Sequence, residues 1–563
     1  MKRRSFLQSI TWGSGALLSW PVRSDANTLS PKEPLVQLQA DLVIAGAGLG
    51  GLAAALAALR NKQTVILTEE TDWIGGQVSQ QGVPPDEHQW IETHGATALY
   101  RHWRNRIRNY YRQNYPLTEA AQQRPLLNPG DGAVSRLCHE PKVAVAVFME
   151  LLAPHLSNGK LQLLLQHKAV SAEKNGNRVH ALLVKDQSGV LKKLIAPYFV
   201  DATELGDLLP ITGTEYRTGT EAKSQTGELH APGKADPLNS QSFTMCFAMD
   251  YVPGENHTIP EPPDYAFWKN YSPDLQPAWP GRLLDLQYSD PRTGKPKQLG
   301  FHPEGIATGD RLNLWNYRRI ISKDNFKPGT YAGDITIVNW PQNDYMLGTI
   351  IDVPEKEKVY HINRAKQLSL SLLYWLQTEV PRPDGGKGWP GIRLRKDVMG
   401  THDGLAKYPY VREARRIEAV FTVKEEHVGM EQRRQLSADA SLAWGAAFED
   451  SVGIGYYPID LHPTNHKVNY VDFNALPFQI PLGALIPIRM ENLLPANKNI
   501  GTTHITNGCY RLHPVEWSIG EAVGCLVAFA KEQGLTPRQV RELKIKEFQS
   551  FISSQGIETA WPL

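Results

Sequence analysis

The first clear pattern along the chain is an apolar run, a long stretch of small and apolar residues, and a second apolar run. Residues 42–45 are continuously apolar, which is typical of a strand buried on both faces of a parallel sheet. The Ala- and Leu-rich stretch that follows reaches Leu59 and is long enough for a buried helix, and residues 65–67 are apolar again. This order predicts two parallel strands joined by a helix, a βαβ unit.

Later apolar runs extend the predicted sheet. Residues 161–165 have the composition of a buried strand. Residues 169–185 read as two strands around the turn Asn-Gly-Asn at 175–177, which predicts a hairpin. Residues 198–204 predict another strand, which ends in small residues. Parallel strands, helices and a meander together indicate the α/β class.

Two segments have the period of an amphipathic helix. Residues 363–380 carry a stripe of large apolar side chains that indicates core packing, and Pro381 follows them; the stripe is Leu368, Leu372, Trp375 and Leu376. Residues 100–112 have aromatic and apolar side chains on one side and five arginines in all. These arginines either receive an anionic ligand or form a solvated basic face, and the pattern favours the solvated face.

The turn after the first strand is the first feature that indicates chemistry. Gly46, Gly48 and Gly51 have the spacing G-x-G-x-x-G, and Glu69 stands just past the second strand. Gly46 permits a tight turn, Gly48 lets a pyrophosphate approach the backbone, and Gly51 lets helix and strand pack closely. The helix N-terminus offers N–H groups and partial positive charge to phosphates, and Glu69 can accept hydrogen bonds from a ribose diol. These parts in register predict a dinucleotide site rather than an ordinary turn.

Several features favour FAD over a nicotinamide dinucleotide. Gly75 and Gly76 follow the acid in a second glycine-rich loop. Pro514 and Glu516 suit the first turn of a late helix, whose N-terminus would stabilise an anionic reduced flavin. A reductase that uses NAD(P)H would carry a second fingerprint. Residues 386–391 match its glycine spacing, but a proline inside the motif excludes the strand-turn-helix context.

With these motifs the chain resembles the FAD-dependent oxidoreductase family within the glutathione-reductase-like superfamily. The resemblance rests on residues 41–77, 198–207, 412–423 and 492–524. Glu204 departs from the glycine that is common at its position there. The resemblance implies FAD as the cofactor and a Rossmann-like domain with these contacts: Gly46, Ala47, Gly48, Leu49, Gly50, Gly51, Glu69, Glu70, Gly75, Gly76, Gln77, Ala202, Thr203 and Gly520.

The same reasoning divides the chain into two lobes. The FAD-binding domain is predicted to be discontinuous and to consist of residues 38–82, 138–228 and 484–545. Residues 83–137 and 229–483 are predicted to form an α+β lobe that covers a small-molecule substrate.

The N-terminus resembles a twin-arginine export signal. Arg3 and Arg4 precede Phe6 and Leu7, and a mildly apolar stretch then leads to small residues suited to cleavage, so residues 1–26 are predicted to be the signal. Twin-arginine translocase carries folded proteins, so the cofactor would be acquired before export. This predicts a periplasmic or thylakoid-lumen protein.

Composition excludes several classes. The net charge of +2 over 563 residues argues against a nucleic-acid-binding protein, and nothing after the signal is apolar enough for stable membrane insertion. The four cysteines form no C-x-x-C pair, and the histidines have no metal-ligand spacing, so no metal site is predicted.

Hydride transfer to a flavin needs a base for the substrate's proton and groups that hold the substrate. His504, His513 and His462 lie in segments predicted to border the flavin, and for each of them a structural hydrogen bond is the alternative. Arg511, beside His513, is predicted to stabilise reduced flavin or to hold substrate.

Substrate-binding groups are predicted in two further segments. Arg412 and Arg415 suit a carboxylate or oxyanion, unless salt bridges to Glu413 or Glu418 occupy them. Residues 339–345 form a polar and aromatic loop of the kind that lines sugar or amine pockets, or else a well-packed turn.

These features together predict an exported FAD-dependent oxidoreductase. It would abstract a hydride from a CH–OH or CH–NH carbon of a small polar substrate and pass electrons to oxygen, a quinone or a periplasmic acceptor. The alternatives are an FAD-containing lyase or isomerase without net redox turnover and a non-catalytic nucleotide-binding protein.

Overall fold

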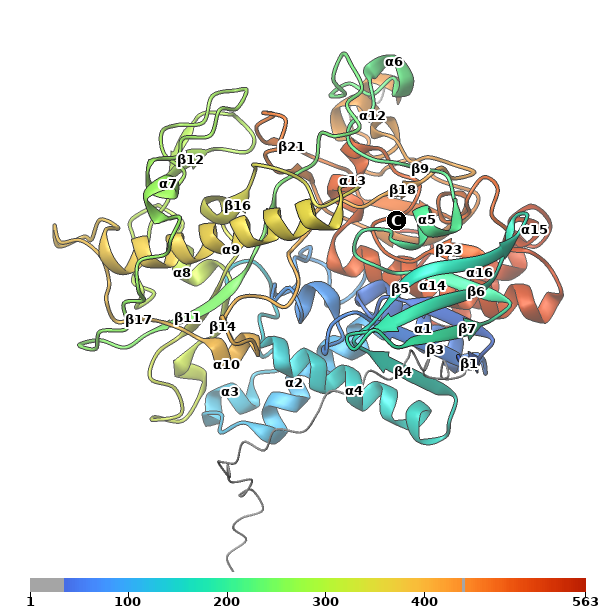
Figure 1. Cartoon of the computed structure of the whole chain (residues 1–563), viewed down its shortest axis with the longest axis horizontal. Helices are drawn as coiled ribbons and strands as arrows, with labels where there is room; N and C mark the ends of the chain where they lie inside the picture. Colours follow the sequence, from blue (N-terminus) through green and yellow to red (C-terminus); the bar gives the residue numbers. More distant parts are fainter. Residues whose placement is uncertain (1–34, 438–440, 563) are drawn as a thin grey trace, which may run out of the picture.

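The computed structural model describes residues 35–437 and 441–562, and a five-stranded parallel sheet is the centre of one lobe. Its strands, in the order β23–β8–β2–β3–β4, are Leu493–Pro495, Tyr198–Asp201, Leu42–Ala45, Val65–Glu69 and Leu161–Leu165. They come from the beginning, middle and end of the chain, as the blue, teal and red ribbons of Figure 1 show. The predicted α/β fold with a parallel sheet is confirmed. The predicted export signal lies outside the described residues.

A β-meander covers one face of the parallel sheet. Its strands run in the order β1–β7–β6–β5 and are Val36–Gln39, Leu191–Ile195, Arg178–Asp186 and His167–Asn175. Asn175 pairs with Arg178, so the predicted hairpin and its turn are confirmed. Leu182 and Leu194 of the meander pack with Val43 of the parallel sheet in one buried cluster.

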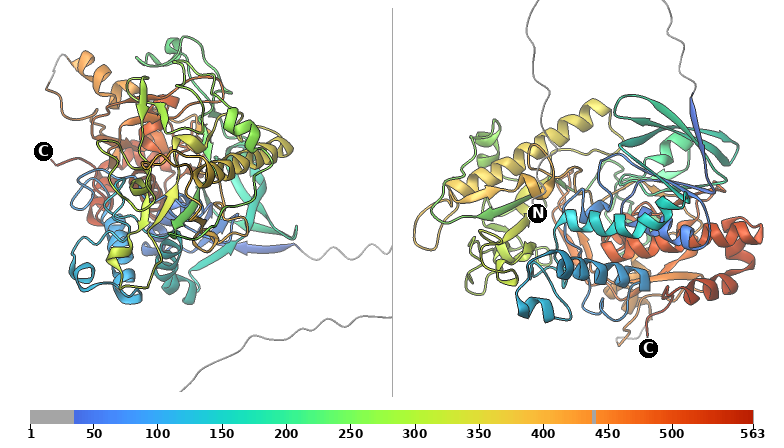
Figure 2. Two further views of the ribbon diagram at one scale, coloured as in Figure 1. Left: turned by 90° about the vertical axis from the view of Figure 1, so that its left-hand side faces the viewer. Right: turned by 90° about the horizontal axis from the view of Figure 1, so that it is seen from below.

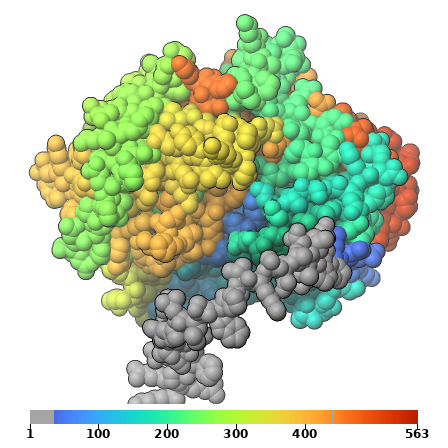
Figure 3. All heavy atoms as spheres, viewed as in Figure 1, coloured from blue at the N-terminus to red at the C-terminus, as the bar shows by residue number. Residues whose placement is uncertain are grey.

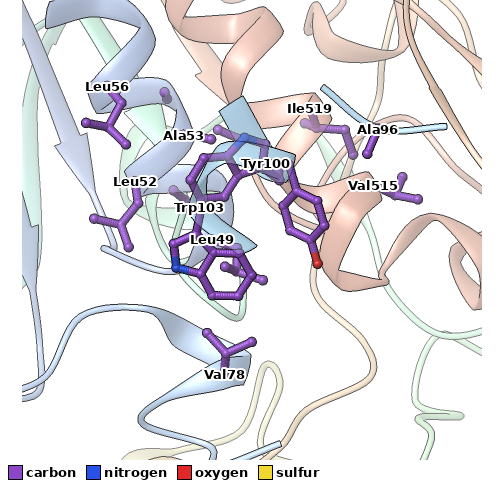
Figure 4. Packing of buried hydrophobic residues seen from close by; sticks show 14 of the residues in the cluster. Leu49, Leu52, Ala53, Leu56, Val78, Ala96, Tyr100, Trp103, Val515 and Ile519 are labelled. Atoms are coloured by element: carbon purple, nitrogen blue, oxygen red, sulfur yellow. The ribbon is translucent and has the colours of Figure 1, made fainter. Parts of the chain in front are cut away.

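Helices cover the opposite face. They are α1 (Leu49–Arg60), α2 (Ala98–Asn114), α4 (Pro141–Ser157) and α14 (His513–Gln533). Figure 4 shows Leu52 of α1, Tyr100 and Trp103 of α2, and Ile519 of α14 converging in one core. The α14 helix, which begins where Pro514 predicts, therefore packs beside the helix that follows the glycine turn.

Gly520 has a different role from the predicted one. An ideal Cβ on Gly520 would lie 2.0 Å from the carbonyl oxygen of Gly50 in α1, and one on Gly524 would lie 2.3 Å from that of Ala54. The missing side chains let α1 and α14 touch through their backbones. Gly520 therefore faces the neighbouring helix α1, whereas the sequence analysis assigns it to the cofactor.

The α2 helix is confirmed, but two of its arginines do not form a solvated face. Arg104 and Arg108 are buried, and both pair with Glu92 from the preceding loop. Arg104 also pairs with Glu87 at 2.8 Å. The loop acids fold over the basic side of the helix, so these guanidinium groups hold the loop rather than a ligand.

The second lobe combines an antiparallel sheet with helices. The sheet has the order β14–β15–β11–β17, with bounds Arg319–Ile321, Ile335–Val338, Phe247–Tyr251 and Ile392–Leu394. The long helix α9 (Glu355–Thr378) lies in this lobe, begins two turns earlier than predicted, and is exposed on the yellow surface of Figure 3. Figure 2 places it well apart from the red α14. Of the helices described, none is both long and apolar enough to cross a membrane.

Candidate functional site

The glycine turn leaves no room for side chains. Gly46 has φ +95°, and an ideal Cβ on it would lie 2.2 Å from the carbonyl oxygen of Ala202. One on Gly51 would lie 2.0 Å from the carbonyl oxygen of Gly46. The strand β8 therefore passes directly beneath the turn, as the small Ala202 and Thr203 suggest, and no side chain caps the first turn of α1.

Glu69 stands at the end of β3 beside this turn. Its carboxylate accepts hydrogen bonds from the backbone N–H groups of Ala47 at 3.0 Å and Thr71 at 2.9 Å. Burial raises the pKa of Glu69 to about 7. The residue lines a groove of about 500 Å³, whose other walls include Gly46, Gly48, Glu70, Gln81, Lys168, Ala202, Thr203, Glu204 and Tyr408. The groove thus joins the end of β3 to the glycine turn.

The double-glycine loop packs against the same turn. The Gly75 N–H donates to the Ala47 carbonyl at 2.8 Å, and an ideal Cβ on Gly76 would lie 2.8 Å from the Cα of Gly48. The Gln77 amide donates to Glu516 and to the backbone carbonyl of Arg511. This loop therefore connects the glycine turn to the N-terminus of α14.

A buried ionic cluster lies where α1 and α14 begin. Lys498 Nζ is 2.6 Å from Glu204 Oε2, and Glu204 Oε1 would be 3.1 Å from a Cβ on Gly48. Burial raises the pKa of Glu516 to about 8, although Lys498 lowers it. One carboxylate thus reaches the place where the glycine spacing predicts a pyrophosphate.

Besides the glycines, two observations indicate that the groove suits a dinucleotide. Gln81 is fully buried, and neither atom of its amide has a hydrogen-bond partner among the described residues. Glu204 Oε1 is likewise buried without a partner in that part of the chain. Buried polar atoms are normally paired, so these groups indicate a polar ligand in the groove.

A second cavity has about 220 Å³ of free space and is lined mainly by residues within 288–472, together with Asp86 and Arg511. Tyr410 lines it, and Tyr408, two residues earlier, lines the groove, so one segment borders both spaces. Three predicted residues meet there, namely Arg412, His462 and Arg511, together with Asn339 and Trp340 of the polar and aromatic loop.

His462 is held in a carboxylate–imidazole pair. Its Nδ1 is 2.6 Å from Oδ2 of Asp344, which is fully buried, and its Nε2 is 3.6 Å from Oδ2 of Asp460. Asp344 also accepts from the Thr244 hydroxyl at 2.6 Å and pairs with Arg412 at 3.0 Å. With the proton on Nδ1 bound to Asp344, Nε2 is the nitrogen that can accept a proton.

The predicted arginines separate into two places. Arg412 and Arg511 line the cavity, and Arg511 pairs with Asp460 at 3.0 Å. Arg415 is not among the cavity-lining residues and pairs with Asp207 at 3.1 Å and Asp352 at 2.7 Å. Salt bridges therefore hold Arg415, but the acids are Asp207 and Asp352 and not the predicted Glu413 or Glu418.

The other two histidines have internal partners. The His504 ring contacts Glu413, whose pKa is lowered to about 2 despite its burial because the His504 ring and Arg416 stabilise the carboxylate. His513 Nδ1 accepts from the Asp86 N–H at 3.1 Å, and burial lowers the pKa of His513 to about 3, so the ring is neutral. Neither ring lines the cavity.

Sequence reasoning missed several functional-site residues. Tyr317, Arg318 and Asp86 line the cavity, yet they lie in segments without a recognisable motif. Asp460 and Lys498 stand inside segments singled out above. A charged residue between the apolar Ile459 and Leu461 was the available signal for Asp460, whereas Lys498 stands between two asparagines and carries no such signal. The described residues contain no cluster of three or more side chains suited to a metal, and their four cysteines are buried and unpaired.

Solved structures that match the chain are distant from it in sequence. The p-nitrophenol 4-monooxygenase PnpA from Pseudomonas putida DLL-E4 is 10% identical with a TM-score of 0.34, over 93% of this chain and 88% of that one. A geranylgeranyl bacteriochlorophyll reductase-like protein from Thermoplasma acidophilum is 10% identical with a TM-score of 0.31, over 93% and 85%. L-proline dehydrogenase from P. horikoshii is 17% identical with a TM-score of 0.17. That match covers 34% of this chain and only a quarter (25%) of the dehydrogenase.

A comparison of the chain with models of protein families identifies its family. No curated protein is a significant match to the chain. The family model described as FAD dependent oxidoreductase matches residues 41–552, which include both the groove and the cavity. The chain therefore belongs to the FAD-dependent oxidoreductase family, and its cofactor is FAD.

Proposed function

We propose that the protein is a dehydrogenase or oxidase that removes a hydride from a CH–OH or CH–NH carbon of a small polar substrate. The observation that carries this proposal is the Asp344–His462 pair, whose imidazole lines a cavity adjoining the FAD groove through the segment of Tyr408 and Tyr410. A positioned base near a bound flavin is what alcohol or amine oxidation requires.

FAD would be held by the groove residues. The N-terminus of α1 and Gly48 would accommodate the pyrophosphate, and Glu69 would accept hydrogen bonds from the ribose. Lys498, buried beside Glu204, would supply positive charge near the phosphates. When bound, FAD supplies the acceptor for the substrate's hydride.

The chain's own residues handle the substrate's proton and orientation. His462 Nε2 accepts the proton from the substrate hydroxyl or amine, while Asp344 fixes the tautomer and stabilises the charged ring. Asp460, 3.6 Å from Nε2, adds further stabilisation for the imidazolium. Asp460 and Asp344 hold Arg511 and Arg412 in place, and these two arginines orient the substrate.

Anaerobic flavin bleaching tests this function. Purified protein with FAD is mixed with alcohols and amines without oxygen, and loss of the oxidised-flavin absorbance is followed together with product. Bleaching with stoichiometric ketone, aldehyde or imine supports oxidation. Product formation with persistent yellow colour would instead support the lyase or isomerase alternative. Absence of both with every compound would support a non-catalytic role.

We also propose that the protein is exported through twin-arginine translocase, acts in the periplasm or a thylakoid lumen, and passes electrons to oxygen, a quinone or a periplasmic acceptor. The pattern Arg3-Arg4 with Phe6-Leu7 supports export, and the missing second fingerprint supports an acceptor other than NAD(P)H. The glycine turn at Gly46 and the Gly75-Gly76 loop support placing the protein in the glutathione-reductase-like superfamily. Arg3→Lys with Arg4→Lys should leave the precursor in the cytoplasm, and unchanged export would refute the targeting proposal.

A further inference from the structure

The charged side chains of the cavity wall are paired, including Asp472, which lies 3.1 Å from Arg292. Three arginines line the cavity, and each is already paired with a buried or half-buried aspartate: Arg318 with Asp86 at 3.2 Å, Arg412 with Asp344 at 3.0 Å, and Arg511 with Asp460 at 3.0 Å. A carboxylate ligand would have to displace one of these acids from its partner. An ammonium ligand would have to compete with an arginine for an acid. The ion pairs therefore favour an uncharged ligand.

The same walls carry an excess of unused hydrogen-bond donors. Five buried N–H groups of lining residues have no hydrogen-bond partner among the described residues: Arg318 Nε, Arg412 Nε, Arg511 Nε, Asn339 Nδ2 and Trp340 Nε1. Two buried oxygens of lining residues, Tyr470 Oη and Asp472 Oδ1, also lack a hydrogen bond in that part of the chain, so the donors without a partner outnumber the acceptors. Buried donors are normally satisfied. A ligand rich in acceptor oxygens, such as hydroxyl and ether oxygens, would satisfy them without bringing charge.

Aromatic side chains make up much of the remaining wall. They are Tyr288, Tyr317, Trp340, Tyr410, Tyr457 and Tyr470. The face of an aromatic ring carries partial negative charge, so it attracts the weakly positive C–H groups on one face of a saturated oxygen ring. About 220 Å³ of the cavity is free space, which is more than a single small alcohol needs.

We propose that the substrate is an uncharged carbohydrate or cyclic polyol, oxidised at a secondary CH–OH carbon. The proposal rests on the oxidoreductase function proposed above and commits it to alcohols rather than amines. The C–H bond breaks with its electron pair leaving as hydride to FAD, and the O–H proton passes to His462 Nε2. The alcohol becomes a ketone as the C–O single bond becomes double, and FAD is reduced by two electrons.

Binding and redox chemistry can be tested separately on the FAD-loaded full-length protein. Calorimetry measures the affinity for methyl glucoside, cellobiose and myo-inositol, and for glucuronate and glucosamine as matched charged rings. Anaerobic bleaching is followed with the same compounds. At least one neutral ring should bind at least tenfold more tightly than its charged counterpart and should bleach the flavin.

A charge variant sharpens the test. Asp472 lines the cavity and pairs with Arg292 at 3.1 Å, and Asp472→Asn removes one negative charge from the wall while keeping the size of the side chain. Affinity for glucuronate should rise at least tenfold, while affinity for the neutral rings changes less than threefold. Asp290→Asn is the control, because Asp290 pairs with Lys297 on the same lobe and does not line the cavity. It should leave both affinities unchanged.

The outcomes separate the two proposals. Tight binding of neutral rings without bleaching by any compound would overturn the redox function and keep the ligand class. Bleaching by amines or carboxylates with no binding of neutral rings would overturn the ligand class and keep the redox function. An equal rise in the affinity for glucuronate in Asp472→Asn and Asp290→Asn would also overturn the proposed ligand class, because the charge of the cavity wall would not be the cause.

Discussion

The FAD groove and the substrate cavity are built in different ways. The groove is shaped mainly by backbone: its central glycines lie within one stretch of sequence and exclude side chains, as the 2.2 Å approach at Gly46 illustrates. The cavity is shaped by side chains that converge from Asp86, Arg318, His462 and Arg511, far apart in the chain. A backbone site is encoded locally, whereas a side-chain site is encoded by the whole fold.

Particular buried acids of the two regions have pKa values shifted in opposite directions. Burial raises the pKa of Glu69 to about 7 and of Glu516 to about 8 in and beside the groove. In the cavity, His462 and Arg511 hold the pKa of Asp460 well below its usual range despite its burial. The contrast belongs to these residues and not to every acid of the two sites, because Lys498 pairs with Glu204 at the groove and burial raises the pKa of Asp472 in the cavity to about 6.

Loss of FAD has the largest expected consequence, because no flavin reduction is possible without the cofactor, and it tests the groove alone. Gly48→Val places a branched side chain where the pyrophosphate approaches, and the nearest atom is the flexible end of Glu204, so the fold can accommodate it. We expect FAD affinity to fall at least about 100-fold, or about 2.7 kcal/mol. Flavin fluorescence titration measures it. Gly233→Val is the control, because an ideal Cβ on Gly233 would have no atom within 4 Å. Normal FAD loading of Gly48→Val would refute the pyrophosphate assignment.

Replacing the proposed base, His462, changes the cavity and leaves the FAD groove intact. His462→Gln removes the proton acceptor, so flavin reduction by substrate should slow by about 10²–10⁴-fold with FAD content unchanged. Stopped-flow absorbance under anaerobic conditions measures the rate. His466→Gln is the matched control, because His466 forms a similar 2.6 Å pair with Asp236 on the surface. A comparable loss in His504→Gln with a normal rate in His462→Gln would transfer the base role to His504.

The contrast explains what the sequence could predict. The strands β2, β3, β4 and β8 and the glycine turn followed from local patterns, because the apolar runs and the glycine spacing can be read within single stretches of sequence. The Ala202 carbonyl that Gly46 approaches lies far away in the sequence, and the glycine spacing does not identify it. The pairing of His462 with Asp344 joins residues 118 positions apart, and no local pattern encodes it. The helix α2 was predictable, but the burial of Arg104 depended on loop acids whose path only the fold determines.

A smaller effect is expected at the junction of α1 and α14. Glu204 Oε1 lies close to the expected pyrophosphate position, and its charge opposes the phosphates. Glu204→Gln keeps the shape and frees Lys498, so FAD affinity should rise by about 3- to 10-fold. Lys498→Met should lower it, because the buried cation beside the groove is lost. Weaker FAD binding by Glu204→Gln would mean that the carboxylate assists the cofactor.

The last prediction concerns the pH dependence of stability, and it differs between the two regions. In the folded protein the pKa of Glu516 is about 8, against an ordinary value of 4.5, so the folded state binds an extra proton between these values. Its contribution to the free energy of unfolding is therefore present at low pH and is lost as pH rises toward 8. The stability of Glu516→Gln relative to the parent should rise from pH 5 to 8 and then level off, as measured by urea unfolding of the FAD-free proteins.

Asp460→Asn should show no such trend over this range, because a lowered pKa leaves Asp460 ionised in both states above pH 5. A rising trend for Asp460→Asn, or a flat one for Glu516→Gln, would erase the electrostatic difference between groove and cavity.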